Sequence, residues 1–123
     1  MLIALGIDVV ETHRIAALLE RHKERFTELV LSEREVDLLG SVRVPFVAGR
    51  WAAKEAIMKA LGQGFGVLQM PDIEVLRKPN GAAEVVLKNE ALTLAQTLNI
   101  HRWQISISHE RLVTVAVACA LSE

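Results

Sequence analysis

The sequence predicts a single α+β domain in which antiparallel strands pack against a long central helix. Residues 2–10 form an apolar run with β-branched members, which is typical of a strand. Residues 45–61 form a longer apolar stretch, as expected for a helix, and residues 103–108 and 113–120 are β-branched runs that a polar segment separates, which indicates an antiparallel pair. No repeat, low-complexity tract or interdomain linker divides the chain, so we expect one domain over residues 1–123.

The first half of the chain predicts one strand followed by two helices. The initial apolar run is continuous, which favours a strand covered on both faces. Thr12 is a suitable cap for a helix over residues 13–26. Ser32 and Glu35 form a capping box, which predicts a second, shorter helix that ends at Gly40.

The rest of the chain predicts the long helix, a hairpin and a further helix before the closing strands. Pro45 fits the first turn of the long helix, and Gly62 is expected to end it. Asn80-Gly81 is a good turn signal, and Asn89 is a suitable cap for a helix to about residue 98. The predicted hairpin strands are residues 73–76 and 84–87.

Composition narrows the classes of function. With 14 basic and 15 acidic residues the net charge is −1, and only two Trp and three Phe can stack on bases, so we expect no nucleic-acid partner. The apolar N-terminal run contains Asp8 and no basic leader, which argues against a signal peptide or a membrane span. Cys119 is the single cysteine, which suits a cytoplasmic location. The apolar fraction of 51% is high for this length, so we expect some burial between subunits.

Two carboxylates interrupt segments that are otherwise apolar. Asp8 lies in the first strand-like run, and Glu55 lies in the long helix-like stretch. An ionised carboxylate that leaves water costs several kcal/mol unless a cation compensates it. A shared divalent metal would compensate both acids, and a separate Arg or Lys partner for each acid is the alternative.

The long helix carries cations beside Glu55. Lys59 follows Glu55 at i, i+4, and Arg50 and Lys54 form a neighbouring i, i+4 pair. This pattern fits an exposed salt pair, and it also fits a phosphate site with a carboxylate for magnesium and cations for the remaining phosphate oxygens. Magnesium usually takes one or two protein carboxylates, which is what Asp8 and Glu55 offer.

Glycines and one histidine give weaker signals. Gly62, Gly64 and Gly66 follow a helix instead of preceding one, so they match neither a Walker loop nor a dinucleotide fingerprint. They fit a helix stop and turn, or a flexible loop whose backbone approaches a ligand. His109 ends a strand with Ile107 on the same face, and no Ser-His-acid triad surrounds it, so both a structural and a functional role stay open.

The predicted helix over residues 13–26 carries an arginine stripe. At 100° per residue, Arg14, Arg21 and Arg25 project within about 40° of one another, with Leu18 among them. Such a stripe is typical of a solvated face. It also suits an acidic partner helix, because arginines bind carboxylates around one apolar contact.

Three motifs resemble those of the small, holo-acyl-carrier-protein synthase type of 4'-phosphopantetheinyl transferase. They are Gly6-Ile7-Asp8-Val9-Val10 with Arg14-Ile15, the segment from Phe46 to Ala56 that continues through Lys59 to Gly62, and Ser106-Ile107-Ser108-His109-Glu110. Their order and spacing cover nearly the whole chain. The resemblance implies a transferase that moves 4'-phosphopantetheine from coenzyme A to a serine of apo acyl carrier protein, depends on Mg²⁺ and releases adenosine 3',5'-bisphosphate.

The resemblance also implies roles for individual residues. Asp8 and Glu55 match the magnesium ligands, and Lys59 matches the lysine beside the reacting phosphate. The residues that match the coenzyme A site are Arg50, Lys54, Lys59, Gly62, Gly64 and His109, and those that match the carrier-protein docking surface are Arg14, Leu18, Arg21 and Arg25.

The resemblance further implies a homotrimer with active sites between subunits. Phosphoryl transfer needs positioning and charge neutralisation more than covalent catalysis, so the absence of a nucleophile motif is no objection. The general base stays open among Glu55, Asp8 and a metal-held water, with Glu55 preferred. The alternative function is a non-catalytic coenzyme A, nucleotide or carrier-protein binding module.

Overall fold

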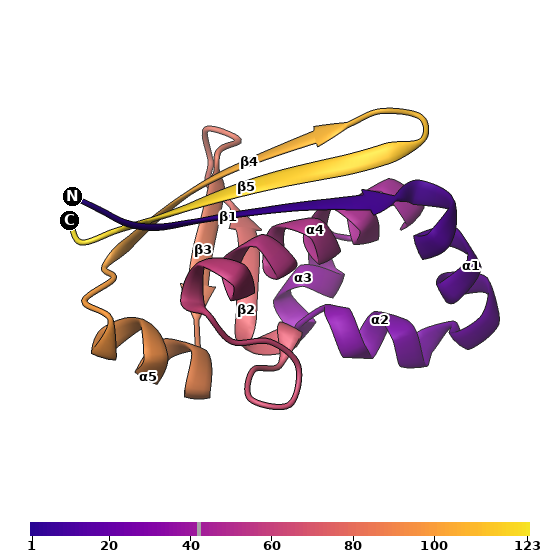
Figure 1. Ribbon diagram of the computed structural model, residues 1–123. Helices are drawn as coiled ribbons and strands as arrows, with labels where there is room; N and C mark the ends of the chain where they lie inside the picture. Colours follow the sequence, from indigo (N-terminus) through magenta and orange to yellow (C-terminus); the bar gives the residue numbers. More distant parts are fainter. Residues whose placement is uncertain (42) are drawn as a thin grey trace.

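Figure 1 shows a three-stranded sheet with helices gathered on one of its faces. The computed structural model describes residues 1–41 and 43–123. In chain order the elements are β1 (Leu2–Glu11), α1 (Thr12–His22), α2 (Glu24–Val30), α3 (Glu33–Leu38), α4 (Arg43–Leu61), the 3-10 helix η1 (Met70–Asp72), β2 (Ile73–Arg77), β3 (Ala83–Leu87), α5 (Asn89–Thr97), β4 (Arg102–His109) and β5 (Val113–Leu121). This arrangement confirms the predicted α+β class.

The main sheet has the strand order β1-β5-β4, with both pairs antiparallel. Asp8 of β1 lies opposite Ala116 of β5, and Ile107 of β4 lies opposite the same residue from the other side. The hairpin β2-β3 forms a separate antiparallel sheet around the predicted Asn80-Gly81 turn. The closing strand pair and the hairpin are therefore confirmed.

Helix α4 packs closely on β1 and β5 because small residues form the contact. The alanines at 116, 118 and 120 of β5 are fully buried. A Cβ added to Gly6 of β1 would lie 1.8 Å from the Ala56 carbonyl oxygen of α4, far inside van der Waals contact. Glycine at this position thus brings the backbone of β1 onto α4 two residues before Asp8.

The predicted helix over residues 13–26 is two helices. Lys23 adopts a left-handed φ of 48°, which ends α1 and sends α2 in a new direction, so Arg25 lies on α2. The predicted cap at Thr12 is also wrong, because Glu11 is the N-cap residue and the Thr12 hydroxyl is buried without a partner among the described residues. No glycine or proline marks the break at Lys23 in the sequence.

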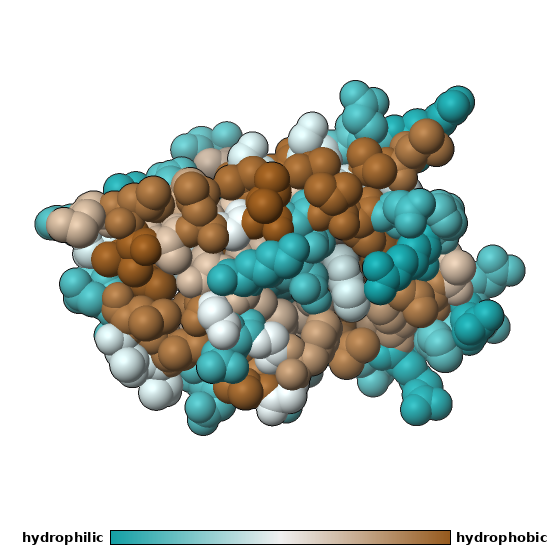
Figure 2. All heavy atoms as spheres, in the orientation of Figure 1, coloured by the Kyte–Doolittle hydropathy of each residue, from teal (hydrophilic) through white to brown (hydrophobic). Residues whose placement is uncertain are grey.

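The N-terminal strand is covered on one face only, which corrects the predicted double coverage. Gly6 and Val10 are buried against the helices, whereas Leu5, Ile7 and Val9 are 57%, 56% and 59% exposed. Figure 2 shows the resulting band of apolar side chains along this part of the surface. Residues along β1 therefore alternate between a covered and an exposed face, and the sequence does not show this alternation because the exposed face is also apolar.

Other local predictions have mixed outcomes. The capping box of Ser32 and Glu35 is present, and α3 ends at Leu38. Gly62 ends α4 with φ 78°, and its N–H donates to the Met58 carbonyl. Asn89 is not a cap: Lys88 is the N-cap residue, and the Asn89 amide donates to Asp72. In the part of the chain that the structure describes, no helix is both long and apolar enough to cross a bilayer.

Candidate functional site

The predicted acids Asp8 and Glu55 meet where β1 crosses α4. The Lys59 Nζ donates to Asp8 Oδ1 at 3.3 Å and to the Ile7 carbonyl at 2.9 Å. Burial raises the pKa of Asp8 above its ordinary value, although Lys59 opposes this shift. Burial also raises the pKa of Glu55, and the negative charge of Asp8 raises it further. The two carboxylates therefore lie close enough to repel each other.

This carboxylate pair fits a magnesium ion. Asp8 and Glu55 offer carboxylate oxygens close to each other, and the described residues contain no larger group of three or more His, Cys, Asp or Glu side chains that could hold a metal. Two carboxylates suffice for Mg²⁺, which keeps waters and takes substrate phosphate oxygens for its remaining positions. A divalent cation would also relieve the repulsion that raises the pKa of Glu55.

An open cavity of about 340 Å³ adjoins Glu55 and Lys59. It is lined by Glu55, Met58 and Lys59 of α4 and by Gly62, Gln63 and Gly64 of the following loop. A Cβ at Gly64 would meet nothing within 4 Å, so the loop backbone is open to an approaching ligand. The predicted residues Glu55, Lys59, Gly62 and Gly64 thus share one cavity.

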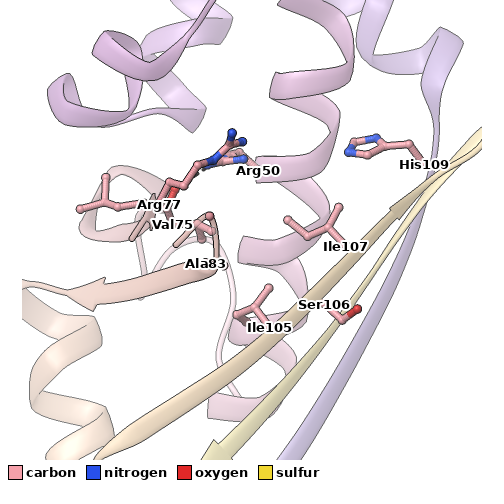
Figure 3. A pocket seen from close by; sticks show the side chains of 10 residues that line it. Arg50, Val75, Arg77, Ala83, Ile105, Ser106, Ile107 and His109 are labelled. Carbon is pink, nitrogen blue, oxygen red and sulfur yellow. Dashed lines mark hydrogen bonds between the residues drawn. The ribbon is translucent and has the colours of Figure 1, made fainter. Parts of the chain in front are cut away.

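A second cavity of about 340 Å³ lies between α4, β4 and the β2-β3 hairpin. The guanidinium of Arg50 and the imidazole of His109 border it, together with Arg77 of the hairpin (Figure 3). Figure 3 also shows Ile105 and Ile107 projecting from β4 toward the hairpin, which gives the cavity an apolar wall. Cations above an apolar wall suit a ligand with phosphates and a flat ring.

Neighbouring groups hold Arg50 and His109 in place. The Arg50 Nε donates to the Val75 carbonyl at 3.1 Å, and its guanidinium lies 4.2 Å from the centre of the Phe46 ring. Burial lowers the pKa of Arg50 from its usual high value. Thr114 Oγ1 lies 3.3 Å from His109 Nδ1, and Gly49 leaves room for the imidazole, because a Cβ there would be 3.0 Å from its Cε1.

Sequence reasoning missed the hairpin side of this cavity. Arg77 and Gly81 line it together with backbone and side-chain atoms of β2 and β3. The Asn80-Gly81 signal predicted the turn, and the basic residue Arg77 before it was the available sign of a phosphate-binding role. The sequence does not show that Arg77 lies beside Arg50, because the two residues are 27 positions apart in the chain.

The two cavities lie on different sides of α4. Arg50 and Glu55 are five residues apart, so they project about 140° from each other around the helix axis. The cavity beside Glu55 and the cavity beside Arg50 share no lining residue among those described. One chain therefore presents the predicted site in two separate parts.

Lys54 does not reach either cavity, which corrects its predicted contact with the nucleotide. Its side chain is 0% exposed, and its ammonium group donates to the Glu35 carboxylate and to the carbonyls of Val30 and Met70. Burial lowers the pKa of Lys54 to about 8, against the opposing effect of Glu35. All three donors of the ammonium group are thus used inside the fold.

The predicted docking residues remain neighbours despite the break in their helix. Arg14, Leu18 and Arg21 of α1 border a cavity of about 380 Å³. Leu18 also borders a cavity of about 490 Å³ between α1, α2 and α4, where Arg25 joins it. Leu18 therefore links the two basic groups across an apolar groove that contains Phe26.

Known proteins resemble this chain over its whole length. Residues 4–118 match the model of the 4'-phosphopantetheinyl transferase superfamily. The holo-[acyl-carrier-protein] synthase of Clostridium kluyveri is 39% identical over 125 residues, covering 100% of this chain and 91% of that protein. The structure of the Neisseria meningitidis holo-[acyl-carrier-protein] synthase superposes with a TM-score of 0.90 at 27% identity, covering 98% of this chain and 99% of that one. The Helicobacter pylori enzyme in complex with coenzyme A gives 0.84 at 34% identity, covering 95% and 99%.

Proposed function

The chain belongs to the 4'-phosphopantetheinyl transferase superfamily, and we propose that it transfers 4'-phosphopantetheine from coenzyme A to a serine of apo acyl carrier protein. The reaction releases adenosine 3',5'-bisphosphate. The observation that carries this proposal is the pairing of Asp8 with Glu55, which lies beside Lys59 at an open cavity. A pyrophosphate needs neutralising charge, which Lys59 and a divalent cation held by the two acids would supply there.

Asp8 and Glu55 would hold Mg²⁺, which, when bound, neutralises charge on the pyrophosphate of coenzyme A. Lys59 adds a fixed positive charge at the same cavity, and the backbone of Gly62 and Gly64 lets the substrate lie close to the loop. The serine of the carrier protein must lose a proton during the transfer. Among Glu55, Asp8 and a metal-held water, Glu55 is our preferred base, because its side chain borders the open cavity.

The nucleotide part of coenzyme A is proposed to bind in the cavity beside Arg50. Arg50, Arg77 and His109 offer donors to phosphate oxygens, and the isoleucines of β4 offer an apolar wall to the adenine ring. This assignment includes Arg50 and His109 from the predicted site, adds Arg77 and omits Lys54.

The separation of the two cavities supports a shared site in a homotrimer. A second chain that packs against the exposed apolar face of β1 would cover Leu5, Ile7 and Val9 and could bring its Arg50 cavity toward Asp8. A mixing experiment tests this arrangement. Glu55→Ala and Arg50→Ala chains, each impaired alone at a low coenzyme A concentration, should regain activity when co-expressed, because some sites then combine an intact Glu55 with an intact Arg50. No recovery in verified mixed oligomers would contradict a shared site.

The carrier protein is proposed to dock on Arg14, Leu18, Arg21 and Arg25. Three arginines at two neighbouring cavities that share Leu18 suit an acidic amphipathic helix. Arg21→Glu should raise KM for carrier protein with little change in KM for coenzyme A. Equal changes in both KM values would contradict this docking surface.

The reaction itself is tested by the intact mass of an apo acyl carrier protein after incubation with this chain, coenzyme A and magnesium. A gain of one phosphopantetheine that disappears on chelation supports the proposal. Coenzyme A binding without any mass gain on several carrier proteins would favour the non-catalytic binding module. The cytoplasmic location and the absence of nucleic-acid and membrane partners stay predictions from the sequence.

A further inference from the structure

Glu35 and Lys54 form an ion pair that is completely buried where α3, α4 and β2 meet. Both side chains are 0% exposed. One oxygen of Glu35 accepts from the Lys54 ammonium group and from the Ser32 N–H at 2.9 Å. A buried ion pair is weak evidence for stability, because desolvation offsets most of the attraction. Stability alone therefore does not explain why this ion pair is buried.

The second oxygen of Glu35 is linked to the Arg50 cavity through the backbone of β2. It accepts from the Val75 N–H at 2.9 Å, and the carbonyl of the same residue accepts from Arg50 Nε at 3.1 Å. The N–H and C=O of one strand residue point to the same side, so these two bonds occupy the edge of β2 that faces away from β3. A continuous chain of hydrogen bonds thus runs from Lys54 through Glu35 and the Val75 backbone to Arg50.

The structure assigns Glu35, held by Lys54, as a positioning residue that places β2 and the Arg50 guanidinium for the nucleotide end of coenzyme A. This assignment rests on the proposed nucleotide role of the Arg50 cavity. Val75 itself lines that cavity, so a shift of its backbone changes both the wall and the arginine. Glu35 itself does not line that cavity, and its hydrogen bond to a lining residue goes to the backbone N–H of Val75, which distinguishes it from a binding residue.

Charge supports the same assignment. Burial and the neighbouring Arg77 both lower the pKa of Arg50, and Glu35 is the group that opposes them. Lys54 balances the carboxylate, so the buried set is not left with an excess negative charge. Each hydrogen bond to the Glu35 carboxylate among the described residues comes from a donor, which means that a glutamine cannot replace it: the NH₂ end of its amide would face an N–H group.

Two variants test the assignment. Glu35→Gln keeps the size of the side chain and disrupts one of its contacts. The double variant Glu35→Leu with Lys54→Met removes both charges together, and proteins often stay folded when a buried ion pair is replaced by apolar residues. For folded protein, KM for coenzyme A should rise about tenfold in each, whereas kcat and KM for carrier protein stay within about twofold. A merely structural role would lower the active fraction and leave both KM values unchanged.

Glu74 provides the matched control. It is a fully buried carboxylate on β2, next to Val75 in the chain, and it binds Ser32, Arg34 and Lys88 instead of Val75 or Arg50. Glu74→Gln should destabilise the fold and leave KM for coenzyme A unchanged. An equal rise in this variant would show general loosening of β2 and would overturn the assignment.

Arg50→Ala distinguishes the nucleotide role of the Arg50 cavity from the positioning role of Glu35. It should raise KM for coenzyme A by itself, and Glu35→Gln should then add little in the Arg50→Ala background, because both act through one group. If Arg50→Ala raises KM and the Glu35 variants do not, the positioning role is wrong and the nucleotide cavity stands. If Arg50→Ala leaves KM unchanged, the cavity does not bind the nucleotide and the positioning role falls with it.

Discussion

Lys54 and Glu55 are adjacent in the sequence and have opposite environments. Lys54 is fully enclosed, and its three donors bind Glu35 and two backbone carbonyls. Glu55 lies half-buried at an open cavity, where burial and the charge of Asp8 raise its pKa. The two side chains project about 100° apart around α4, which is enough to place one in the core and the other at the surface.

The difference shows how to separate structural charges from functional ones. A buried charge whose partners all come from its own fold defines the packing and has no capacity left for a ligand. An acid beside another acid is unfavourable in the isolated chain, and a bound cation removes that repulsion. By this criterion Lys54 has no direct contact with a ligand, and we expect the pair of Asp8 with Glu55 to bind a cation.

The sharpest mutational contrast is between Lys54→Met and Lys59→Met. The first leaves Glu35 buried without its cation, so the free energy of unfolding should fall by about 4 kcal/mol. Lys59 is 55% exposed, so its replacement should change that free energy by less than about 1 kcal/mol while lowering kcat. Urea denaturation at fixed protein concentration measures the first effect and steady-state kinetics the second. Equal stabilities would contradict the distinction between the two lysines.

Gly6→Ala tests how β1 is held against α4. The added Cβ would meet the backbone of Ala56, which no side-chain rotation relieves, so a loss of about 3 kcal/mol is expected. Gly64→Ala is the matched control, because the space around Gly64 is open, and its thermal midpoint should match that of the wild type. A stable Gly6→Ala protein would mean that α4 can move away from Asp8.

Glu74 gives a pH-dependent prediction on the enclosed side of the molecule. The hydrogen bond from Arg34 is the largest cause that lowers the pKa of Glu74 to about 2, from 4.5. Its contribution to stability is therefore complete above pH 4.5 and is lost as the pH falls through 2. Arg34 is 57% exposed, so solvent screening reduces this contribution to about 2 kcal/mol.

The measurement is the difference in unfolding free energy between wild type and Glu74→Gln. It should be largest at pH 7 and shrink as the pH falls below 4.5. A difference that stays constant down to pH 3 would show that packing, and not the charge of Glu74, is responsible.

The smallest expected effect is a gain in stability at the functional acid. The raised pKa of Glu55 means that its charged form is disfavoured in the folded chain, so its contribution begins to oppose folding as the pH rises above the ordinary pKa of 4.5 and does so fully above the raised pKa. Glu55→Gln should therefore stabilise the metal-free protein at pH 7 by about 0.5 kcal/mol. The comparison is made by thermal unfolding in chelator, and a lower midpoint in the variant would contradict the repulsion between Asp8 and Glu55.

The sequence predicted the elements that depend on local signals. The capping box at Ser32, the stop at Gly62, the hairpin turn at Asn80-Gly81 and the long helix are all confirmed. The break at Lys23 has no such signal, because a lysine adopts positive φ there, which is uncommon for a residue other than glycine. Alternation in β1 was hidden because its exposed face is also apolar.

The candidate site was predictable in part. Motif spacing identified Asp8, Glu55 and Lys59, and the structure brings them together. The same spacing could not assign Lys54, since the burial of its side chain depends on an ion pair with Glu35 of α3. The contribution of Arg77 likewise depends on how the hairpin folds over α4, which is a contact between distant segments.

The role of Asp8 and Glu55 is tested most directly by the rate of phosphopantetheine transfer, measured as a function of magnesium concentration for wild type and for Glu55→Gln. The intact mass of the carrier protein reports the transfer. Wild type should show a saturable dependence on magnesium. Glu55→Gln should be slower by about 10³-fold, or about 4 kcal/mol, at every magnesium concentration, while remaining folded. A variant that keeps the wild-type rate and the same magnesium dependence would contradict the role of the Asp8 and Glu55 pair.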